Sequence, residues 1–333
     1  MSKSYAHVLS FALSHPWAVM PDMLSVIANI LAHRVAGIEM PRAEIEAALV
    51  NRKNLPQPRA GSVAIIPVYG VISPRVNMMT EMSGGTTYEK LTAQLRESAA
   101  AKDVKTIVLD VDSPGGSVAG NAELASEIMR LRSKKPIIAQ AQYTMGSAAY
   151  HIAAACTEIV AAPSARVGSI GAYMIHNEIS EALKQLGVKR TFISAGEGKV
   201  DGNEAEPLSP TALARMEASV NEAYGQFVSN VVKGRGAGMT ADRVRTEWKA
   251  HVYGATEALS IGMIDRIGTL DDTLARLLSG SSDDPNDQRT ALTLTSGHDT
   301  TQEPARATVQ DRASEAELER RVLELTLNAS LTQ

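Results

Sequence analysis

The chain has 333 residues, which is enough for one large domain with extensions or for two domains. Its formal charge of −4 and its 4% aromatic content give no reason to expect nucleic acid as a partner. The single cysteine, Cys156, excludes an internal disulfide bond and is typical of a reducing compartment. Cys156 lies in an apolar run, so we expect a buried thiol with a packing role.

The N-terminal residues 1–58 are predicted to form a helical extension. Met23, Ile27 and Ile30 recur at helical spacing, and a second helical pattern begins at Pro41. The apolar runs are too short for a membrane helix, which needs about 20 apolar residues, and they do not fit a signal peptide. We therefore expect a cytoplasmic protein that does not associate with membranes.

Strand-like and helical patterns alternate within residues 59–278, which we predict to be one domain. The strand-like stretches are 62–72, 104–113, 135–142, 157–163 and 188–194, and the helical stretches are 86–101, 122–133, the helix that Ser147 opens, and 176–187. Strands that alternate with helices predict a parallel sheet with crossover helices. The fold class is therefore α/β.

Residues 279–333 differ in character from the domain before them. The stretch 279–310 is polar and has no periodic apolar face, which is typical of a disordered tether. Residues 314–328 then combine a capping box, Ser314 with Glu317, and an apolar face, which predicts a terminal amphipathic helix. This helix either docks back on its own domain or binds a partner.

The stretch LDVDSPGGSVAG (109–120) predicts a strand, a Gly-Gly turn and a helix. Backbone N–H groups in such a turn can stabilise negative charge at a helix N-terminus. The stretch lacks the Lys-Ser/Thr ending of a phosphate-binding loop and the glycine spacing of a dinucleotide site. By itself, such a turn is more often merely a tight connection.

The stretch TMGSAAYHIAAA (144–155) places Ser147 at a strand-to-helix junction. There the amide of Ala148 could face a developing oxyanion, or the serine could be an ordinary N-cap. A serine nucleophile needs an adjacent base. His151 is one helical turn further along the same helix, in a run of Ala and Ile, and is better explained as a core residue than as that base.

The stretch FISAGEGKVDGNEAEPLSP (192–210) places Lys199 in a glycine-flanked loop. Most lysines in such loops are solvated. Burial beside a serine disfavours the charged ammonium, however, and makes a lysine a usable general base near neutral pH. A Ser–Lys pair needs no histidine, metal or cofactor.

The order of these motifs resembles the signal peptide peptidase A (SppA) family of the ClpP/crotonase superfamily. The resemblance rests on DSPGG, on the serine that opens an Ala-rich helix, on ARVGSIGAY (165–173) and on the Gly-Lys loop. The stretch YGATEALSIGMIDRIGTLDD (253–272) is similar to the usual end of the family domain. The match covers roughly residues 62–275 and implies a ClpP/crotonase-like serine peptidase domain.

The resemblance also implies a role for each motif residue. Ser147 would be the nucleophile and Lys199 the general base. The amides of Gly115, Gly116 and Ala148 would form the oxyanion hole, and Ser169 would hold the lysine amine in place. The chain departs from the family where Ala148 and Ala149 follow the serine, a position at which glycines are common.

The N-terminal extension and the lysine loop resemble the branch of the family that tailed phages and prophages encode as head-maturation proteases. The implied function is a homo-oligomeric endopeptidase in the host cytoplasm or inside the procapsid, which cuts scaffold, coat or portal proteins and possibly itself. Three alternatives stay open: a soluble bacterial peptidase that degrades signal peptides or other peptides, a crotonase-type acyl-CoA enzyme, and a non-catalytic assembly factor.

Overall fold

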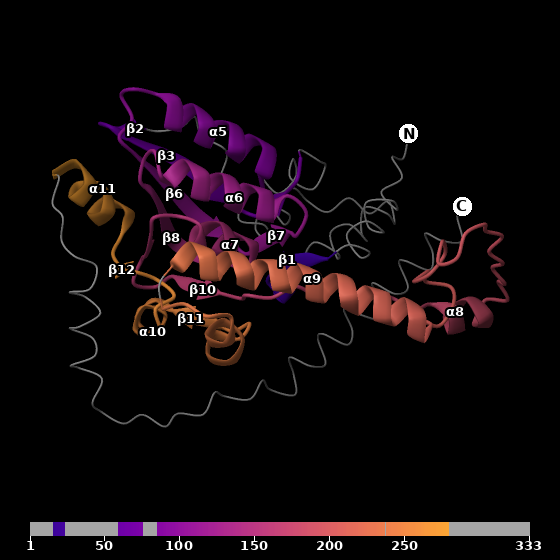
Figure 1. Cartoon of the computed structure of the whole chain (residues 1–333). Helices are drawn as coiled ribbons and strands as arrows, with labels where there is room; N and C mark the ends of the chain where they lie inside the picture. Colours follow the sequence, from indigo (N-terminus) through magenta and orange to yellow (C-terminus); the bar gives the residue numbers. More distant parts are fainter. Residues whose placement is uncertain (1–15, 24–58, 76–84, 237, 280–333) are drawn as a thin grey trace, which may run out of the picture.

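A computed structural model describes residues 16–23, 59–75, 85–236 and 238–279 (Figure 1). The predicted tether and terminal helix, and most of the predicted helical extension, lie outside these residues. The boundaries of the three predicted regions, 1–58, 59–278 and 279–333, therefore stay predictions.

Parallel strands form the centre of the main sheet, as the alternating pattern predicts. Its path runs β11-β10-β8-β6-β3-β2, and β9 joins β8 to β12. The bounds are β2 Arg59–Ala60, β3 Val63–Tyr69, β6 Thr106–Ser113, β8 Ile137–Gly146, β9 Glu158–Ala161, β10 Arg166–Gly168, β11 Val252–Gly254 and β12 Arg266–Ile267. All pairs among β3, β6, β8, β9, β10 and β12 are parallel, and β2 and β11 pair antiparallel. The α/β fold class is confirmed.

Helices cover both faces of this sheet (Figure 1). An apolar core lies on each face, and one of the two is larger. The helices that contribute to the larger core are α5 (Tyr88–Ala100), α6 (Asn121–Arg132), α7 (Ala148–Ala154), α9 (Pro210–Arg235) and α10 (Ala255–Ser260). Alternate strand residues such as Ile66 and Leu109 join that core, while their neighbours Ile65 and Val108 pack against α11 (Leu270–Ser279) on the other face. This alternation follows from the two-residue period of a strand, which gives both faces an apolar layer.

A second, smaller sheet lies beside the first, with the order β1-β7-β4-β5. Its strands are β1 (Trp17–Val19), β4 (Ile72–Ser73), β5 (Thr86–Thr87) and β7 (Gly115–Ser117). Strand β1 lies within the stretch predicted to be helical, so the helical prediction is wrong for these residues. Pro16 and Pro21 flank it, and a proline disfavours helical geometry in the residue before it. The backbone of β7 supplies the partner that an extended segment needs.

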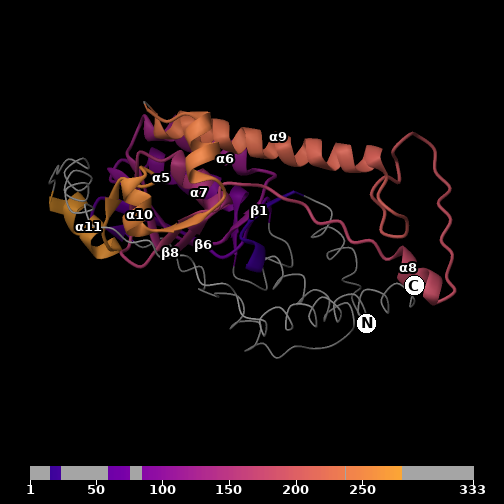
Figure 2. The ribbon, with the colours of Figure 1, turned by 90° about the horizontal axis from the view of Figure 1, so that it is seen from below.

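The strand predicted at 188–194 is also absent. These residues have no regular secondary structure, and the side chain of Ile193 is 97% exposed. After β10 the chain leaves the sheet and runs past α8 (Ser180–Gln185) at the outer end of α9, where none of the described strands lies beside it (Figure 2). A short stretch with β-branched residues does not become a strand without a partner edge.

Helix α9 is the longest described helix and was not predicted. Its first turn carries clear signals, because the Ser209 side chain accepts a hydrogen bond from the Ala212 amide and Pro210 takes the first helical position. Within the described residues no helix is both long and apolar enough to span a membrane.

Candidate active site

Three of the predicted motifs meet at one edge of the main sheet. Strands β6, β8 and β10 are parallel neighbours, and their carboxyl ends are in register, with Gly146 opposite Gly168 and Ser113 opposite Met145. Residues that follow the carboxyl ends of neighbouring parallel strands lie together, where open α/β sheets usually bind ligands. The DSPGG turn, Ser147 and Ser169 are such residues.

Ser147 has an unusual backbone conformation for a serine. It lies between β8 and α7 with φ 52° and ψ −117°, and its amide donates a 2.7 Å hydrogen bond to the carbonyl of Gly168. Its side chain makes no capping hydrogen bond, so the N-cap explanation does not hold. A positive φ at a residue with a Cβ costs about 1 kcal/mol or more, and such strain concentrates at functional sites.

Gly115 lies against this serine. A Cβ on Gly115, whose φ is +108°, would be 2.2 Å from the Ala18 carbonyl oxygen, 2.9 Å from the Ser147 Cβ and 3.0 Å from the Ala148 nitrogen. Only glycine fits this close approach, which brings the turn to the serine and to the first amide of α7. The Gly115 amide donates to the Ser113 hydroxyl at 3.2 Å in this conformation.

Gly116 has a different neighbour. A Cβ there would be 1.9 Å from the carbonyl oxygen of Ile72. The second glycine of the motif therefore lets β7 and β4 come together, while the first is the one that contacts Ser147. Gly116 nevertheless follows Gly115 directly on β7, the strand whose first residue contacts Ser147.

Ser169 follows β10 beside Ser147. It has φ 57°, and its amide donates a 2.7 Å hydrogen bond to the His251 carbonyl. Because Gly168 accepts from the Ser147 amide, the two serines lie at adjacent strand ends.

Lys199 is not near Ser147 in the same chain. It is exposed and belongs to residues 176–209, which include α8 and lie beyond the sheet at the outer end of α9; we call this segment the arm (Figure 2). A Cβ on the neighbouring Gly198 would lie 2.1 Å from the Arg215 guanidinium. Arg215 is twelve residues, or about 18 Å of helix, from Phe227, where α9 packs on α7.

His151 is a packed core residue, as predicted. Its ring stacks on Phe227 at 4.4 Å between centroids, and its Nε2 lies 2.9 Å from the Asn230 amide nitrogen. Burial lowers the pKa of His151 to about 3, so the ring is neutral near pH 7. Cys156 is buried in the larger apolar core, which confirms its predicted packing role, and this burial raises the pKa of its thiol to about 12.

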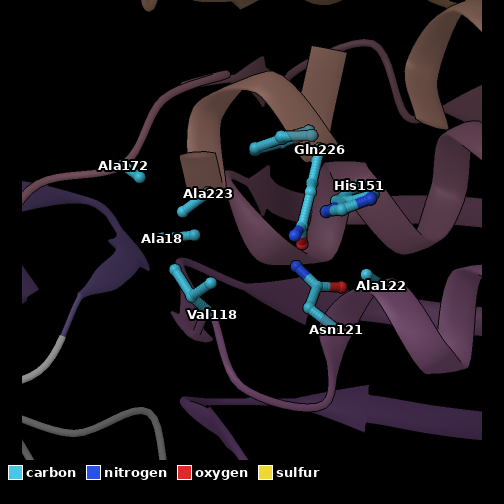
Figure 3. A pocket seen from close by; sticks show the side chains of 9 residues that line it. Ala18, Val118, Asn121, Ala122, His151, Ala172, Ala223 and Gln226 are labelled. Carbon is cyan, nitrogen blue, oxygen red and sulfur yellow. The ribbon is translucent and has the colours of Figure 1, made fainter. Parts of the chain in front are cut away.

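One neighbour of the site, strand β1, was not predicted from the sequence. Ala18 lies over Gly115, and it also borders a small cavity with Asn121, His151 and Gln226 (Figure 3). The available signal was a short, wholly apolar run, Trp17 to Met20, bounded by Pro16 and Pro21. Among the described residues no cluster of His, Cys, Asp or Glu could hold a metal ion.

Comparisons with known proteins find a peptidase family and several proteases that are similar to this chain. Residues 129–282 match the profile of Peptidase family S49. The chain is similar to the head-tail preconnector protein GP5 of Enterobacteria phage P21, with 29% identity over 83% of this chain and 57% of that protein. It is also similar to the capsid assembly protease C of Escherichia phage lambda, with 28% identity over 95% of this chain and 77% of that protein.

Among solved structures, an enoyl-CoA hydratase from Shewanella pealeana covers 88% of this chain and 98% of its own, with a TM-score of 0.39 and 15% identity. The present chain spans little more than half the length of GP5 and about three quarters of that of protease C.

Proposed function

We propose that this chain, an SppA-like member of Peptidase family S49, is a serine endopeptidase that a tailed phage or prophage uses during head assembly. The observation that carries the proposal is the close approach of Gly115 to Ser147 and to the Ala148 amide at the carboxyl edge of the sheet. A strained serine beside converging backbone amides is an arrangement suited to acyl transfer.

In the proposed reaction the Ser147 hydroxyl attacks the carbonyl carbon of a peptide bond and loses its proton to a lysine amine. Backbone amides of Ala148 and of the Gly115–Gly116 turn stabilise the oxyanion. The lysine then protonates the leaving amine, and an acyl-enzyme ester remains on Ser147. Water, deprotonated by the same lysine, hydrolyses the ester and restores the serine.

We assign the base to Lys199 of a neighbouring copy. Within one chain the arm keeps Lys199 far from Ser147, so the dyad needs either a second copy or a large movement of the arm. The arm and the adjoining part of α9 expose several large apolar side chains, as expected for a surface that another subunit covers: Leu186, Phe192, Ile193 and Leu213. The proposed enzyme is therefore a homo-oligomer in which the arm of one copy completes the site of the next.

The proposed substrates are proteins of the assembling head, such as scaffold, coat or portal proteins, cut in the host cytoplasm or inside the procapsid. The support is the similarity to a capsid assembly protease over 95% of the chain. A soluble bacterial peptidase for signal peptides would share the catalytic chemistry but not this substrate.

The test is intact mass over time for the wild type, Ser147→Ala and Lys199→Ala, each incubated with a candidate phage scaffold protein. We expect fragments with the wild type only. Ser126→Ala and Lys189→Ala change an exposed serine and an exposed lysine on the arm, and should cleave like the wild type. Cleavage that persists in Ser147→Ala would refute the mechanism, and cleavage of unrelated peptides but not of scaffold would favour the bacterial role.

A further inference from the structure

Strand β1 is held by backbone groups on both of its edges. On one side it pairs antiparallel with β7, with Ala18 opposite Gly116, and the Met20 amide donates to the Pro114 carbonyl at 2.9 Å. On the other side Trp17 and Tyr173 exchange two hydrogen bonds, of 2.9 and 3.0 Å. An extended peptide bound to a protein through an exposed strand edge is held by the same main-chain bonds.

The same strand covers the candidate nucleophile. The carbonyl oxygen of Ala18 and the Cβ of Ser147 both lie within 3 Å of the point where a Cβ on Gly115 would be. Two residues on, the Met20 Cγ and Sδ lie 3.1 and 3.0 Å from the corresponding point on Gly146. Ser147 is only 1% exposed. A substrate carbonyl therefore has no access to this serine while β1 is in place.

We infer that residues 16–20 occupy the groove between β7 and Tyr173 in which the peptidase binds its substrate, and that the structure is an autoinhibited state. The inference rests on the proposed peptidase function. It predicts that a substrate binds as an extended strand in place of β1, and that activity requires this segment to leave.

The contacts of Ala18 also indicate which substrates fit. Its methyl group borders a cavity of about 10 Å³ together with Val118, Ala172, Ala223 and Phe227 (Figure 3). That space holds about one water molecule, so a long side chain does not fit there. The preferred substrate is then an extended segment with a small residue, such as alanine, at the position whose carbonyl lies beside Ser147.

A binding experiment tests the groove without relying on catalysis. All proteins carry Ser147→Ala, and the probe is a fluorescent peptide with the sequence of residues 14–23. A second substitution, Ala18→Arg, overfills the cavity and displaces β1, whereas Ala119→Arg makes the same change at an exposed residue just after β7. Loss of the internal competitor raises the apparent affinity, so we expect about tenfold tighter peptide binding for Ala18→Arg only. Equal binding by both proteins, or none, overturns the inference.

Met20→Lys provides a second way to displace the strand, because Met20 is only partly buried and its replacement leaves the apolar core intact. It should bind the peptide in the same way. A peptide that carries arginine at the position of Ala18 should not bind either variant, and its binding would refute the preference for a small residue.

The activity of the same substitutions with Ser147 intact separates the two hypotheses. We expect Ala18→Arg and Met20→Lys to cleave scaffold several-fold faster than the wild type and Ala119→Arg. Equal rates for all four proteins would overturn autoinhibition and leave the peptidase proposal standing. Peptide binding without cleavage by any of them would refute the peptidase and retain the groove.

Discussion

The surroundings of Ser147 and of Lys199 differ in how strongly one chain fixes them. Ser147 is buried, its backbone is hydrogen-bonded to β10, and Gly115 contacts it through main-chain atoms. Lys199 is exposed on the arm, which is tied to itself and to α9 by half-exposed ion pairs such as Arg190–Glu204 and Asp201–Arg215. One chain therefore preorganises the proposed nucleophile and oxyanion site, while the proposed base depends on assembly.

Mixing two inactive variants tests this division of the site most directly. Ser147→Ala and Lys199→Ala should each lose at least about a thousandfold in activity. If the base comes from a neighbouring copy, oligomers assembled from both variants should regain about a quarter of the wild-type activity, because some sites combine two intact residues. The measurement is cleavage of scaffold after the variants are unfolded and refolded together, with each variant refolded alone as the control. No recovery in verified mixed oligomers would place the dyad within one chain.

Glycine substitutions should separate the two regions by stability. Gly115→Ala places a Cβ against backbone atoms at a positive φ and should cost about 3 kcal/mol or more. Gly196→Ala, on the arm, also has a positive φ of +98° but meets no atom within 4 Å, so we expect about 1 kcal/mol. Urea unfolding of both variants measures the difference. Similar losses would mean that the packing around Gly115 is less rigid than these contacts indicate.

The sequence predicts the main sheet well because the patterns of its strands and helices are local along the chain. The β-branched runs that became β3, β6 and β9 and the helical stretches that became α5 and α6 keep their period and their turn residues. The motifs DSPGG and TMGSAAY point to the edge where Gly115 and Ser147 meet, because carboxyl ends of parallel strands converge.

What the sequence does not predict depends on partners that are distant along the chain. Trp17–Val19 became a strand because β7 offers an edge, and the run at 188–194 did not because no edge of a described strand lies near it. The separation of Lys199 from Ser147 follows from the direction in which α9 leaves the sheet. Local spacing carries no information about that direction.

The pH dependence of the free energy of unfolding should report on the burial of His151 in helix α7. The pKa of His151 is lowered to about 3 from its ordinary value near 6.5, so the folded state binds its proton less well than the unfolded state. The stability that this group contributes is present above pH 6.5 and is lost as the pH falls toward 3. We expect the free energy of unfolding to fall by about 2 kcal/mol between pH 7 and pH 5 for this reason.

His151→Phe keeps a ring on Phe227 and cannot be protonated, so urea unfolding of this variant should show a correspondingly weaker loss of stability between pH 7 and pH 5. An identical pH slope in wild type and variant would show that the ring is protonated without cost, and that α7 is less tightly packed than its contacts indicate.

The smallest effect on the folded chain is expected at the surface of the arm. Ile193 is 97% exposed, so Ile193→Ser should change the free energy of unfolding of one chain by no more than about 0.5 kcal/mol. If the arm reaches the site of a neighbouring copy, the same change should weaken assembly and lower activity at low protein concentration, with recovery as the concentration rises. Leu278→Ser alters a half-exposed leucine on α11, away from the arm, and should leave assembly intact. Sedimentation and cleavage measured over one concentration series check both outcomes, and activity that falls equally at all concentrations would show that Ile193 acts within its own chain.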